Sequence, residues 1–257
     1  AEQMVEDLRW LGLDWDEGPE TGGPDGPYFQ SRRTALYQAV LERLEALGLV
    51  YPCFCTRAEL HAASAPHRED GLTVYAGTCR HLTPAQRAER AVRRSPALRL
   101  RVPDKEFSFV DGHMGECVEN LERDCGDFLL RRSDGMFAYQ LAVVVDDAAM
   151  GVTEVVRGAD LLSSTPRQLY LYQLLGLTPP EFFHFPLLLA PDGLETGRRR
   201  GAAQPPGAGF RRGAAGPAGA IGGLPPFRRT QPGGGAAGGI FLGNGAPGEY
   251  PLAGKAI

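Results

Sequence analysis

The hydrophobic pattern between Gly126 and Gln168 changes period several times, and these changes predict the centre of the fold. A short apolar run from Asp127 to Arg132 has the length of a β-strand. It ends at Ser133-Asp134-Gly135, which is typical of a hairpin turn because a glycine there can adopt the positive φ that closes it. The next residues are apolar at helical spacing up to Gly151, which stands where a left-handed C-terminal cap is expected.

A second strand and a second helix follow. Thr153 to Val156 is a β-rich run that ends at Arg157, and Thr165 to Gln168 reads Thr-Pro-Arg-Gln. This second segment predicts a helix start, with Thr165 as N-cap, a proline in the first turn and Gln168 as the partner in a capping box. Because strand, helix, strand and helix alternate, we expect an α/β nucleotide-binding sheet.

The same reasoning predicts further helices and strands along the chain. Helices show apolar positions at helical spacing or a capping sequence at their start, and strands show alternating or continuous short apolar runs. The expected helices are residues 1–11, residues 31–47 with Ser31 as N-cap, and those starting at Thr56–Glu59 and Thr83–Gln86. The expected strands are residues 98–102, a strand from Phe107 to a turn at Asp111-Gly112, and Phe185–Leu189.

Composition favours an ordinary globular protein. The chain has 257 residues, 43% of them hydrophobic and 23% charged, which is enough to bury one sizeable core or two small ones. No run of about 18 apolar residues is present to span a membrane, and the N-terminus lacks the pattern of a secretory signal. We therefore expect no membrane partner and a cytoplasmic location.

The net charge of −4 gives no overall basic footprint, so a nucleic acid would need a local basic patch. Four arginines of the helix expected after Thr83 form one candidate: Arg87, Arg90, Arg93 and Arg94. They either contact phosphates or form an ordinary solvated face.

The five cysteines form no even disulfide framework, and three of them suggest a metal site. Cys53 and Cys55 are followed by Cys79, and clustered thiolates are the usual ligands of structural zinc. The alternative is that they are small buried hydrophobic residues. Zinc needs a fourth ligand, for which ligand chemistry favours the imidazole of His81.

Arg157 stands at the carboxyl end of an expected strand, where α/β sheets bind their ligands. The alternative is that it forms an ion pair with a neighbouring acid such as Asp160.

Several motifs resemble a known family. Tyr139 in AYQLAVVVDD, Arg157 in VVRGADLL and the following STPRQ are similar to the second half of the catalytic core of class I glutamyl-tRNA synthetases. The likeness is strongest to the short members of that group, the glutamyl-Q tRNA(Asp) synthetases. The segment from GPYFQSRR to GLVYPCFC also resembles the entry into the family's zinc-bearing insertion.

The resemblance implies a Rossmann-like nucleotide-binding fold with an inserted zinc-bearing α+β subdomain. Residues 1–50 would be the C-terminal part of the first half of the catalytic domain, 51–125 the insertion, and 126–193 the second half. Residues 194–257 would begin with a degenerate KMSKS-like loop. The Gly/Pro/Ala-rich tail that follows has no counterpart in the family, and its composition predicts disorder.

The resemblance also implies a reaction. It is the ATP-dependent activation of glutamate, with Mg²⁺, and transfer of the glutamate to the queuosine base of tRNA(Asp). Tyr139 and Arg157 would bind glutamate, Arg198 would contact ATP, and Tyr75 in the Y-x3-C motif would join Cys53, Cys55 and Cys79 on zinc. No protein nucleophile is needed, so no catalytic residue is assigned, Asp146 and Asp147 are taken as structural, and a monomer is expected.

Two other functions stay open at this stage. One is a fragment of an ordinary glutamyl-tRNA synthetase that charges the tRNA 3′ end, and the other is a non-catalytic remnant that binds zinc and RNA. The N-terminal segment contains no HIGH-like motif, and Glu195 reverses a charge in the KMSKS-like loop. If the chain is complete as written, we expect it to be inactive in glutamate activation.

Overall fold

The computed structural model describes residues 2–10, 12–62 and 74–187. Residues 1–24 belong to one compact unit and residues 25–186 to another. The described part of the first unit contains helix α1, Glu2–Trp10, which confirms the helix expected at residues 1–11. The guanidinium of Arg9 lies 5.4 Å from the centre of the Trp15 ring and 2.6 Å from the Glu20 carboxylate.

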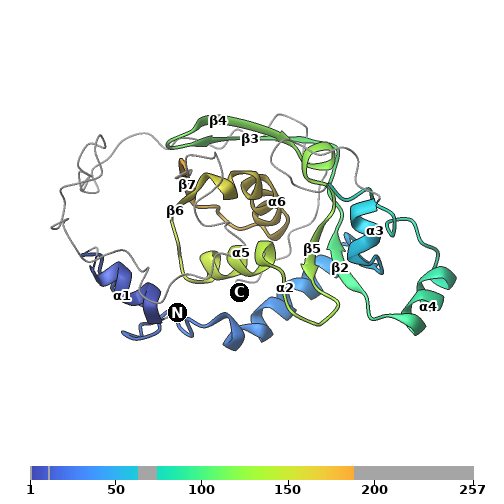
Figure 1. The fold of residues 1–257 in the computed structure, drawn as a ribbon, viewed down its shortest axis with the longest axis horizontal. Coiled ribbons are helices and arrows are strands. Elements are labelled where there is room, and N and C mark those ends of the chain that lie inside the picture. Colours follow the sequence, from blue (N-terminus) through green and yellow to red (C-terminus); the bar gives the residue numbers. More distant parts are fainter. Residues whose placement is uncertain (1, 11, 63–73, 188–257) are drawn as a thin grey trace, which may run out of the picture. The chain divides into compact units, whose positions relative to one another are not determined.

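The described part of the second unit carries the remaining elements, and Figure 1 labels helices α2–α6 and strands β2–β7. In chain order they are η1 Gln30–Arg32, α2 Thr34–Ala46, β1 Val50–Cys53, α3 Arg57–Ala62, α4 Pro84–Arg93, β2 Ala97–Leu100, β3 Glu106–Asp111, β4 Gly115–Asn120, η2 Leu121–Cys125, β5 Phe128–Arg131, α5 Tyr139–Ala149, β6 Glu154–Gly158, η3 Ala159–Ser164, α6 Thr165–Leu175 and β7 Glu181–Phe185.

The strands form three small sheets. Strands β1, β2 and β5 form an antiparallel sheet in that order, and β3 pairs with β4 as a hairpin. Strands β6 and β7 pair in parallel, with α6 in the connection between them. The sequence predicts that the strands at 127–132 and 153–156 share one α/β sheet, but β5 joins the antiparallel sheet instead. Strand β6 pairs with β7, in a register that places Arg157 opposite His184.

The main core lies between helices and sheets. Helix α5 contacts α2 on one side and α6 on the other (Figure 1). Fully buried side chains fill the space between these helices: Leu41, Leu44, Leu141 and Leu171. A second, smaller core surrounds the end of β1, where Tyr51, Phe54 and Cys79 are buried together.

Most element boundaries agree with the sequence, but three expectations are wrong. Helix α2 begins at Thr34 and not at Ser31, because Arg33 is turned into the interior, where its Nη1 donates to the carbonyls of Asp25 and Pro27. Strand β7 ends at Phe185, where it was expected to begin, and Glu181–Phe185 pairs with β6 instead.

The start of α6 is the third difference. Thr165 is the first helical residue, and its N-cap Ser164 makes no side-chain cap. The Thr165 hydroxyl accepts a hydrogen bond from Arg157 at 2.7 Å, and the buried Gln168 donates to Gln140 at 3.1 Å. The capping sequence is thus used for tertiary contacts. By contrast, the capping boxes at Thr56–Glu59 and Thr83–Gln86 are both formed.

No helix among the described residues is long and apolar enough to cross a membrane.

Asp146 ties α5 to the segment before α2. Its carboxylate accepts from Arg33 at 2.6 Å, from the Tyr37 hydroxyl at 2.8 Å and from Gln30 at 3.0 Å. Both members of the Arg33–Asp146 ion pair are buried. This arrangement agrees with the structural role expected for Asp146.

We predict that Asp146→Ala destabilises the protein by about 3–5 kcal/mol, because it leaves the buried Arg33 without a counter-charge. Urea unfolding monitored by circular dichroism measures the change. The matched control is Glu89→Ala, which breaks the exposed Arg93–Glu89 pair and should cost less than about 1 kcal/mol. Equal losses in the two variants would contradict the structural role of Asp146.

We predict that Asp147→Asn stabilises the protein above pH 6. Burial, together with the neighbouring Asp146 carboxylate, raises the pKa of Asp147 to about 6 from its usual value near 4. Because its pKa is higher in the folded state than in the unfolded state, Asp147 contributes fully to the free energy of unfolding below its unfolded-state pKa. This contribution is lost as the pH rises through about 6. Relative to wild type, the variant should gain about 1–2 kcal/mol at pH 8 and nothing at pH 4, measured by urea unfolding at both pH values.

Candidate functional site

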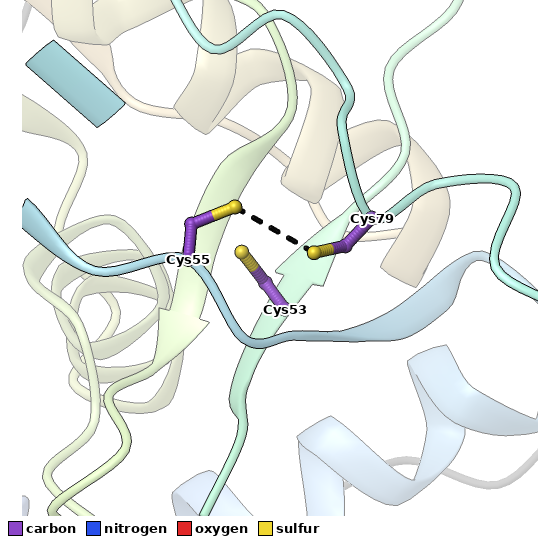
Figure 2. A group of neighbouring side chains, drawn as sticks. All are labelled: Cys53, Cys55 and Cys79. Atoms are coloured by element: carbon purple, nitrogen blue, oxygen red, sulfur yellow. Dashed lines mark hydrogen bonds between the residues drawn. The ribbon is translucent and has the colours of Figure 1, made fainter. Parts of the chain in front are cut away.

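The three cysteine sulfurs meet at the end of β1. Cys53 is the last residue of β1, Cys55 follows two residues later, and Cys79 comes from the segment before α4. Their sulfur atoms lie within 4.8 Å of one another, and Cys55 and Cys79 are 3.6 Å apart. Figure 2 shows the three side chains converging on one small volume.

The Tyr75 hydroxyl completes a four-atom donor set. It lies 3.5 Å from the Cys53 sulfur and 3.7 Å from the Cys55 sulfur. A tetrahedral zinc with Zn–S bonds of about 2.3 Å and a Zn–O bond of about 2.0 Å requires S···S separations of about 3.8 Å and S···O separations of about 3.5 Å. These donor atoms therefore fit zinc. His81 is exposed and is not part of the cluster.

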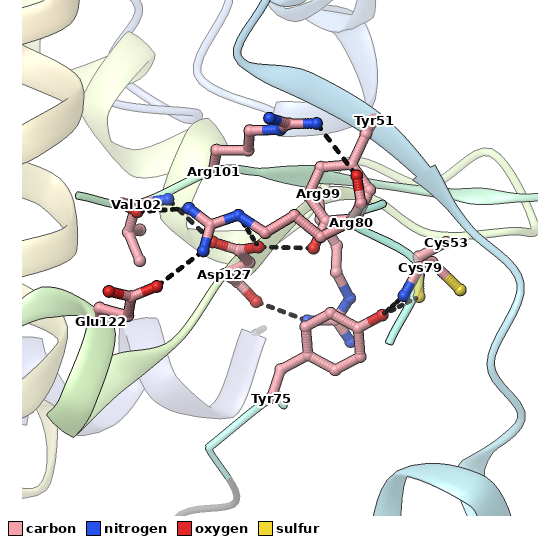
Figure 3. A network of polar contacts seen from close by, with 10 residues as sticks. All are labelled: Tyr51, Cys53, Tyr75, Cys79, Arg80, Arg99, Arg101, Val102, Glu122 and Asp127. Atoms are coloured by element: carbon pink, nitrogen blue, oxygen red, sulfur yellow. Dashed lines mark hydrogen bonds and ion pairs between the residues drawn. The ribbon is translucent and has the colours of Figure 1, made fainter. Parts of the chain in front are cut away.

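Two contacts of Tyr75 suit an oxygen that binds a metal ion. The Cys79 backbone N–H donates to its hydroxyl at 2.8 Å, and the Arg99 guanidinium lies 3.8 Å from the centre of its ring (Figure 3). Arg99 is held in place because its Nη1 donates to the Asp127 carbonyl at 2.7 Å. Without a cation, burial and hydrogen bonding to Cys53 raise the pKa of the Tyr75 hydroxyl. A metal ion would reverse that shift, because it favours the deprotonated ligand.

The thiols differ in their acidity. Burial raises the pKa of Cys53, but hydrogen bonds with Tyr75, the Cys55 backbone and Arg99 outweigh it, and the net shift is downward. Burial and the neighbouring thiols raise the pKa of Cys55 to about 12. The Cys79 sulfur accepts from the Phe54 backbone N–H at 3.4 Å and from Arg90 at 3.8 Å. One thiol is thus more acidic than usual, and another gains hydrogen bonds suited to a thiolate.

Gly126 and Asp127 fasten this cluster to β5. Tyr75 forms a bridge to Gly126, whose φ is +66°, and a Cβ atom added at Gly126 would lie only 2.9 Å from backbone atoms of Tyr75. The buried Asp127 carboxylate accepts from the Tyr51 hydroxyl at 2.6 Å and from the Val102 N–H at 2.8 Å (Figure 3). A side chain at position 126 would therefore separate the Tyr75 segment from β5.

Arg157 occupies the carboxyl end of β6, as expected. Its Nε donates to His184 Nε2 at 2.8 Å, and its Nη2 donates to the Thr165 hydroxyl at 2.7 Å. Burial lowers the pKa of the guanidinium, while the Tyr139 hydroxyl and the Asp147 carboxylate oppose this shift. The expected alternative, an ion pair with Asp160, is not formed; His184 and Thr165 take that place.

Tyr139 is the first residue of α5, and 46% of it is exposed beside Arg157. The structure thus brings together the two residues to which the family resemblance assigns glutamate binding. Arg198, the residue assigned to ATP, lies outside the described residues.

Sequence reasoning missed the residues around Arg157. His184 is fully buried in β7, and its Nδ1 lies 2.6 Å from the carboxylate of Asp111, which ends β3. One signal was available, because a histidine in the apolar run Phe-Phe-His-Phe needs a polar partner when it is buried. Nothing in the local pattern identified Asp111 as that partner.

The arginines of α4 lie on a surface of mixed charge. Arg90, Arg93 and Arg94 line an open groove of about 570 Å³ together with Glu59 and Glu89. Helix α4 buries none of its residues, and Glu89 pairs with Arg93 at 3.0 Å. The groove therefore has both a solvated face and cationic groups that can meet phosphate.

Comparisons with known proteins give a consistent result. The family model of class I tRNA synthetases (E and Q), catalytic domain, matches residues 1–204. Glutamyl-Q tRNA(Asp) synthetase of Nitratidesulfovibrio vulgaris is 60% identical over 202 residues, which cover 77% of this chain and 62% of the relative. The protein of the same name from Symbiobacterium thermophilum is 56% identical over 209 residues, covering 79% of this chain and 63% of the relative. The chain therefore spans less than two thirds of the length of these relatives.

The fold agrees with the family. The crystal structure of a glutamate tRNA ligase from Elizabethkingia meningosepticum, in complex with its amino acid, aligns with a TM-score of 0.63 and 30% sequence identity. The alignment covers 75% of this chain and 40% of that protein. The chain has the class I synthetase fold, and it belongs to the family of class I tRNA synthetases for glutamate and glutamine.

Proposed function

We propose that the protein activates glutamate with ATP and transfers it to the queuosine base of tRNA(Asp). The observation that carries this proposal is the identity of 56–60%, over 202 and 209 residues, to two proteins named glutamyl-Q tRNA(Asp) synthetase. The site supports it, since Tyr139 and Arg157 lie together at the carboxyl end of β6, the usual ligand position in such sheets.

The chemistry needs positioning more than a protein nucleophile. The glutamate carboxylate attacks the α-phosphate of ATP, and pyrophosphate leaves. A hydroxyl of the acceptor nucleoside then attacks the acyl carbon of the acyl-adenylate, which forms a glutamyl ester and releases AMP and a proton. In this scheme Nη1 of Arg157 binds a substrate carboxylate, because Nε and Nη2 already donate to protein partners. Tyr139 hydrogen-bonds the amino acid, Arg198 contacts ATP, and Mg²⁺ accompanies the nucleotide.

Zinc has a structural role in the proposal. Cys53, Cys55, Cys79 and Tyr75 would hold one ion, which joins the end of β1 to the segment before α4. When bound, zinc supplies a cross-link and no reaction step. The chain's own residues then present α3 and α4 as a fixed surface beside the cluster.

A specific observation also supports a second function. The solved relative is a glutamate tRNA ligase, and its fold covers 75% of this chain. Charging of the tRNA 3′ end is therefore the competing proposal. The two functions differ in where the glutamate is attached.

We predict that a form of the protein that includes the complete catalytic domain of its relatives transfers radiolabelled glutamate to tRNA(Asp) only when the tRNA carries queuosine. Nuclease digestion should recover the label in the anticodon fragment. Label in the 3′-terminal fragment of tRNA(Glu) would instead assign the protein to the ordinary ligases. Pyrophosphate exchange with ATP and glutamate, measured in parallel, tests the activation step separately.

We predict that Arg157→Ala lowers kcat/KM for glutamate roughly thirtyfold or more, because the lost carboxylate contact costs about 2–5 kcal/mol of binding free energy. Pyrophosphate exchange measures it. Arg132→Ala is the matched control, because Arg132 is exposed and pairs only locally with Asp134. If Arg157→Ala has the same kcat/KM for glutamate as Arg132→Ala, Arg157 does not bind the substrate carboxylate.

We predict one zinc per chain in protein purified without added metal, measured by mass spectrometry of the metal content. Cys55→Ser should retain less than about half an equivalent, because three donors bind zinc weakly. Tyr75→Phe should lower the zinc content, whereas His81→Ala should not. Loss of zinc in His81→Ala alone would make His81 the fourth ligand.

A further inference from the structure

Asp111, His184 and Arg157 form a continuous buried chain of hydrogen bonds. Asp111 ends strand β3, His184 lies in β7 and Arg157 in β6, so the chain crosses from the β3–β4 hairpin to the parallel strand pair. Asp111 Oδ2 is 2.6 Å from His184 Nδ1, and His184 Nε2 is 2.8 Å from Arg157 Nε. Both Asp111 and His184 are almost completely buried, at 1% and 0% exposure.

The bonding partners determine which ring nitrogen of His184 carries the proton. Arg157 Nε–H can only donate, so His184 Nε2 must be the acceptor. Burial raises the pKa of Asp111, but hydrogen bonds from His184 and three backbone N–H groups outweigh it and hold the pKa below its usual value. Asp111 is therefore an ionised acceptor, and His184 Nδ1 must donate to it. The ring is neutral with its proton on Nδ1, because in an imidazolium the Nε2–H would point at the Arg157 Nε–H and no hydrogen bond could form between them.

The other Asp111 oxygen is equally constrained. Oδ1 accepts from the backbone N–H groups of His113 at 3.0 Å, Met114 at 2.9 Å and His184 at 3.1 Å. The orientation of the carboxylate is thereby fixed by backbone donors, and only Oδ2 is left for the His184 ring.

Gly112 lets the β3–β4 turn lie close to β7. A Cβ atom at this position would overlap the Phe183 ring, and the Gly112 N–H donates to the Phe182 carbonyl at 2.9 Å.

We propose that Asp111 and His184 are positioning residues for the substrate arginine: Asp111 sets the tautomer of His184, whose Nε2 lone pair then orients the Arg157 guanidinium toward the glutamate carboxylate. The role of Arg157 in this statement rests on the proposed function. The tautomer and the bond to Arg157 do not. Thr165 completes the arrangement, because its hydroxyl accepts from Arg157 Nη2 at 2.7 Å.

The competing explanation is that this chain only locks the β3–β4 hairpin onto β7. Two substitutions of His184 separate the alternatives. His184→Asn keeps a side-chain donor near the Nδ1 position, facing Asp111, but removes the acceptor for Arg157. His184→Gln keeps an acceptor near the Nε2 position but loses the donor to Asp111. A purely structural role makes His184→Gln the more harmful change, whereas a positioning role makes His184→Asn the more harmful one for glutamate.

Asp111→Asn tests the tautomer directly. The three backbone donors keep the amide oxygen at the Oδ1 position, so the amide nitrogen faces His184 Nδ1. The imidazole proton is then forced onto Nε2, where it opposes the Arg157 Nε–H. In the double variant Asp111→Asn with His184→Gln there is no tautomer to invert, so the acceptor for Arg157 is restored.

The first experiment is independent of any activity. In the full chain with ¹⁵N-labelled histidine and ¹⁵N-labelled arginine, the ring nitrogens of the five histidines can be assigned by variants. We expect His184 to show a protonated Nδ1 and an unprotonated Nε2 with a scalar coupling to Arg157 Nε, and we expect Asp111→Asn to invert the two nitrogens and abolish the coupling. A wild-type His184 that is protonated on Nε2, or on both nitrogens, would overturn the proposal whether or not the protein uses glutamate.

The second experiment measures pyrophosphate exchange. Asp111→Asn and His184→Asn should raise the KM for glutamate about ten- to a hundredfold, with the KM for ATP changed less than about twofold. His184→Gln and the double variant should stay within about threefold of wild type. Two results would contradict the positioning role and support a purely structural one. The first is an equal rise in the glutamate KM of His184→Gln and His184→Asn, and the second is a double variant that does not recover. If wild type shows no exchange with glutamate, the proposed function fails together with the role of Arg157 toward glutamate. The NMR result then decides only the tautomer of His184 and its bond to Arg157.

Discussion

A carboxylate taken out of water must be surrounded by hydrogen-bond donors, and this requirement organises the second unit. Among the residues that the structure describes, three aspartates are buried, Asp111, Asp127 and Asp146, and each collects donors from segments far away in the sequence. Asp146 joins α5 to the residues before α2, Asp127 joins β5 to β1 and β2, and Asp111 joins the β3–β4 hairpin to β7. Apolar packing supplies most of the favourable free energy, but it is non-directional. The donors that each aspartate requires are directional, and they define which segments meet.

The second of these junctions supports the cysteine cluster. Asp127 follows Gly126, which forms a β-bridge with Tyr75. The Asp127 carbonyl accepts a hydrogen bond from Arg99, whose guanidinium stacks on the Tyr75 ring. The tyrosine oxygen is therefore brought to the three sulfurs by contacts that come from β5 and β2. A metal ion bound there would gain a site whose donors already stand near their tetrahedral separations, so little of its binding free energy would be spent on ordering the chain.

Sequence patterns predict the elements well, because helical spacing and capping sequences are local. The helices α1, α4 and α5 and the strand β6 follow from them directly. The errors occur where a local signal is overridden by a distant partner. Ser31 does not cap α2 because Arg33 is drawn to Asp146, and Thr165 does not cap α6 because its hydroxyl is taken by Arg157. The capping sequence at Thr83 has no such competitor, and it forms as expected.

The candidate site divides in the same way. Cys53, Cys55 and Cys79 are recognisable from spacing and ligand chemistry, and Arg157 from its place at a strand end. The choice of Tyr75 over His81 depends on which side chain the fold turns inward, and spacing alone favours neither. Asp111 was unpredictable for a stronger reason, since it lies 73 residues from His184. A residue that acts through a neighbour is recognised from the tertiary structure and not from sequence spacing. It appears there as a buried polar group whose donors and acceptors are all hydrogen-bonded.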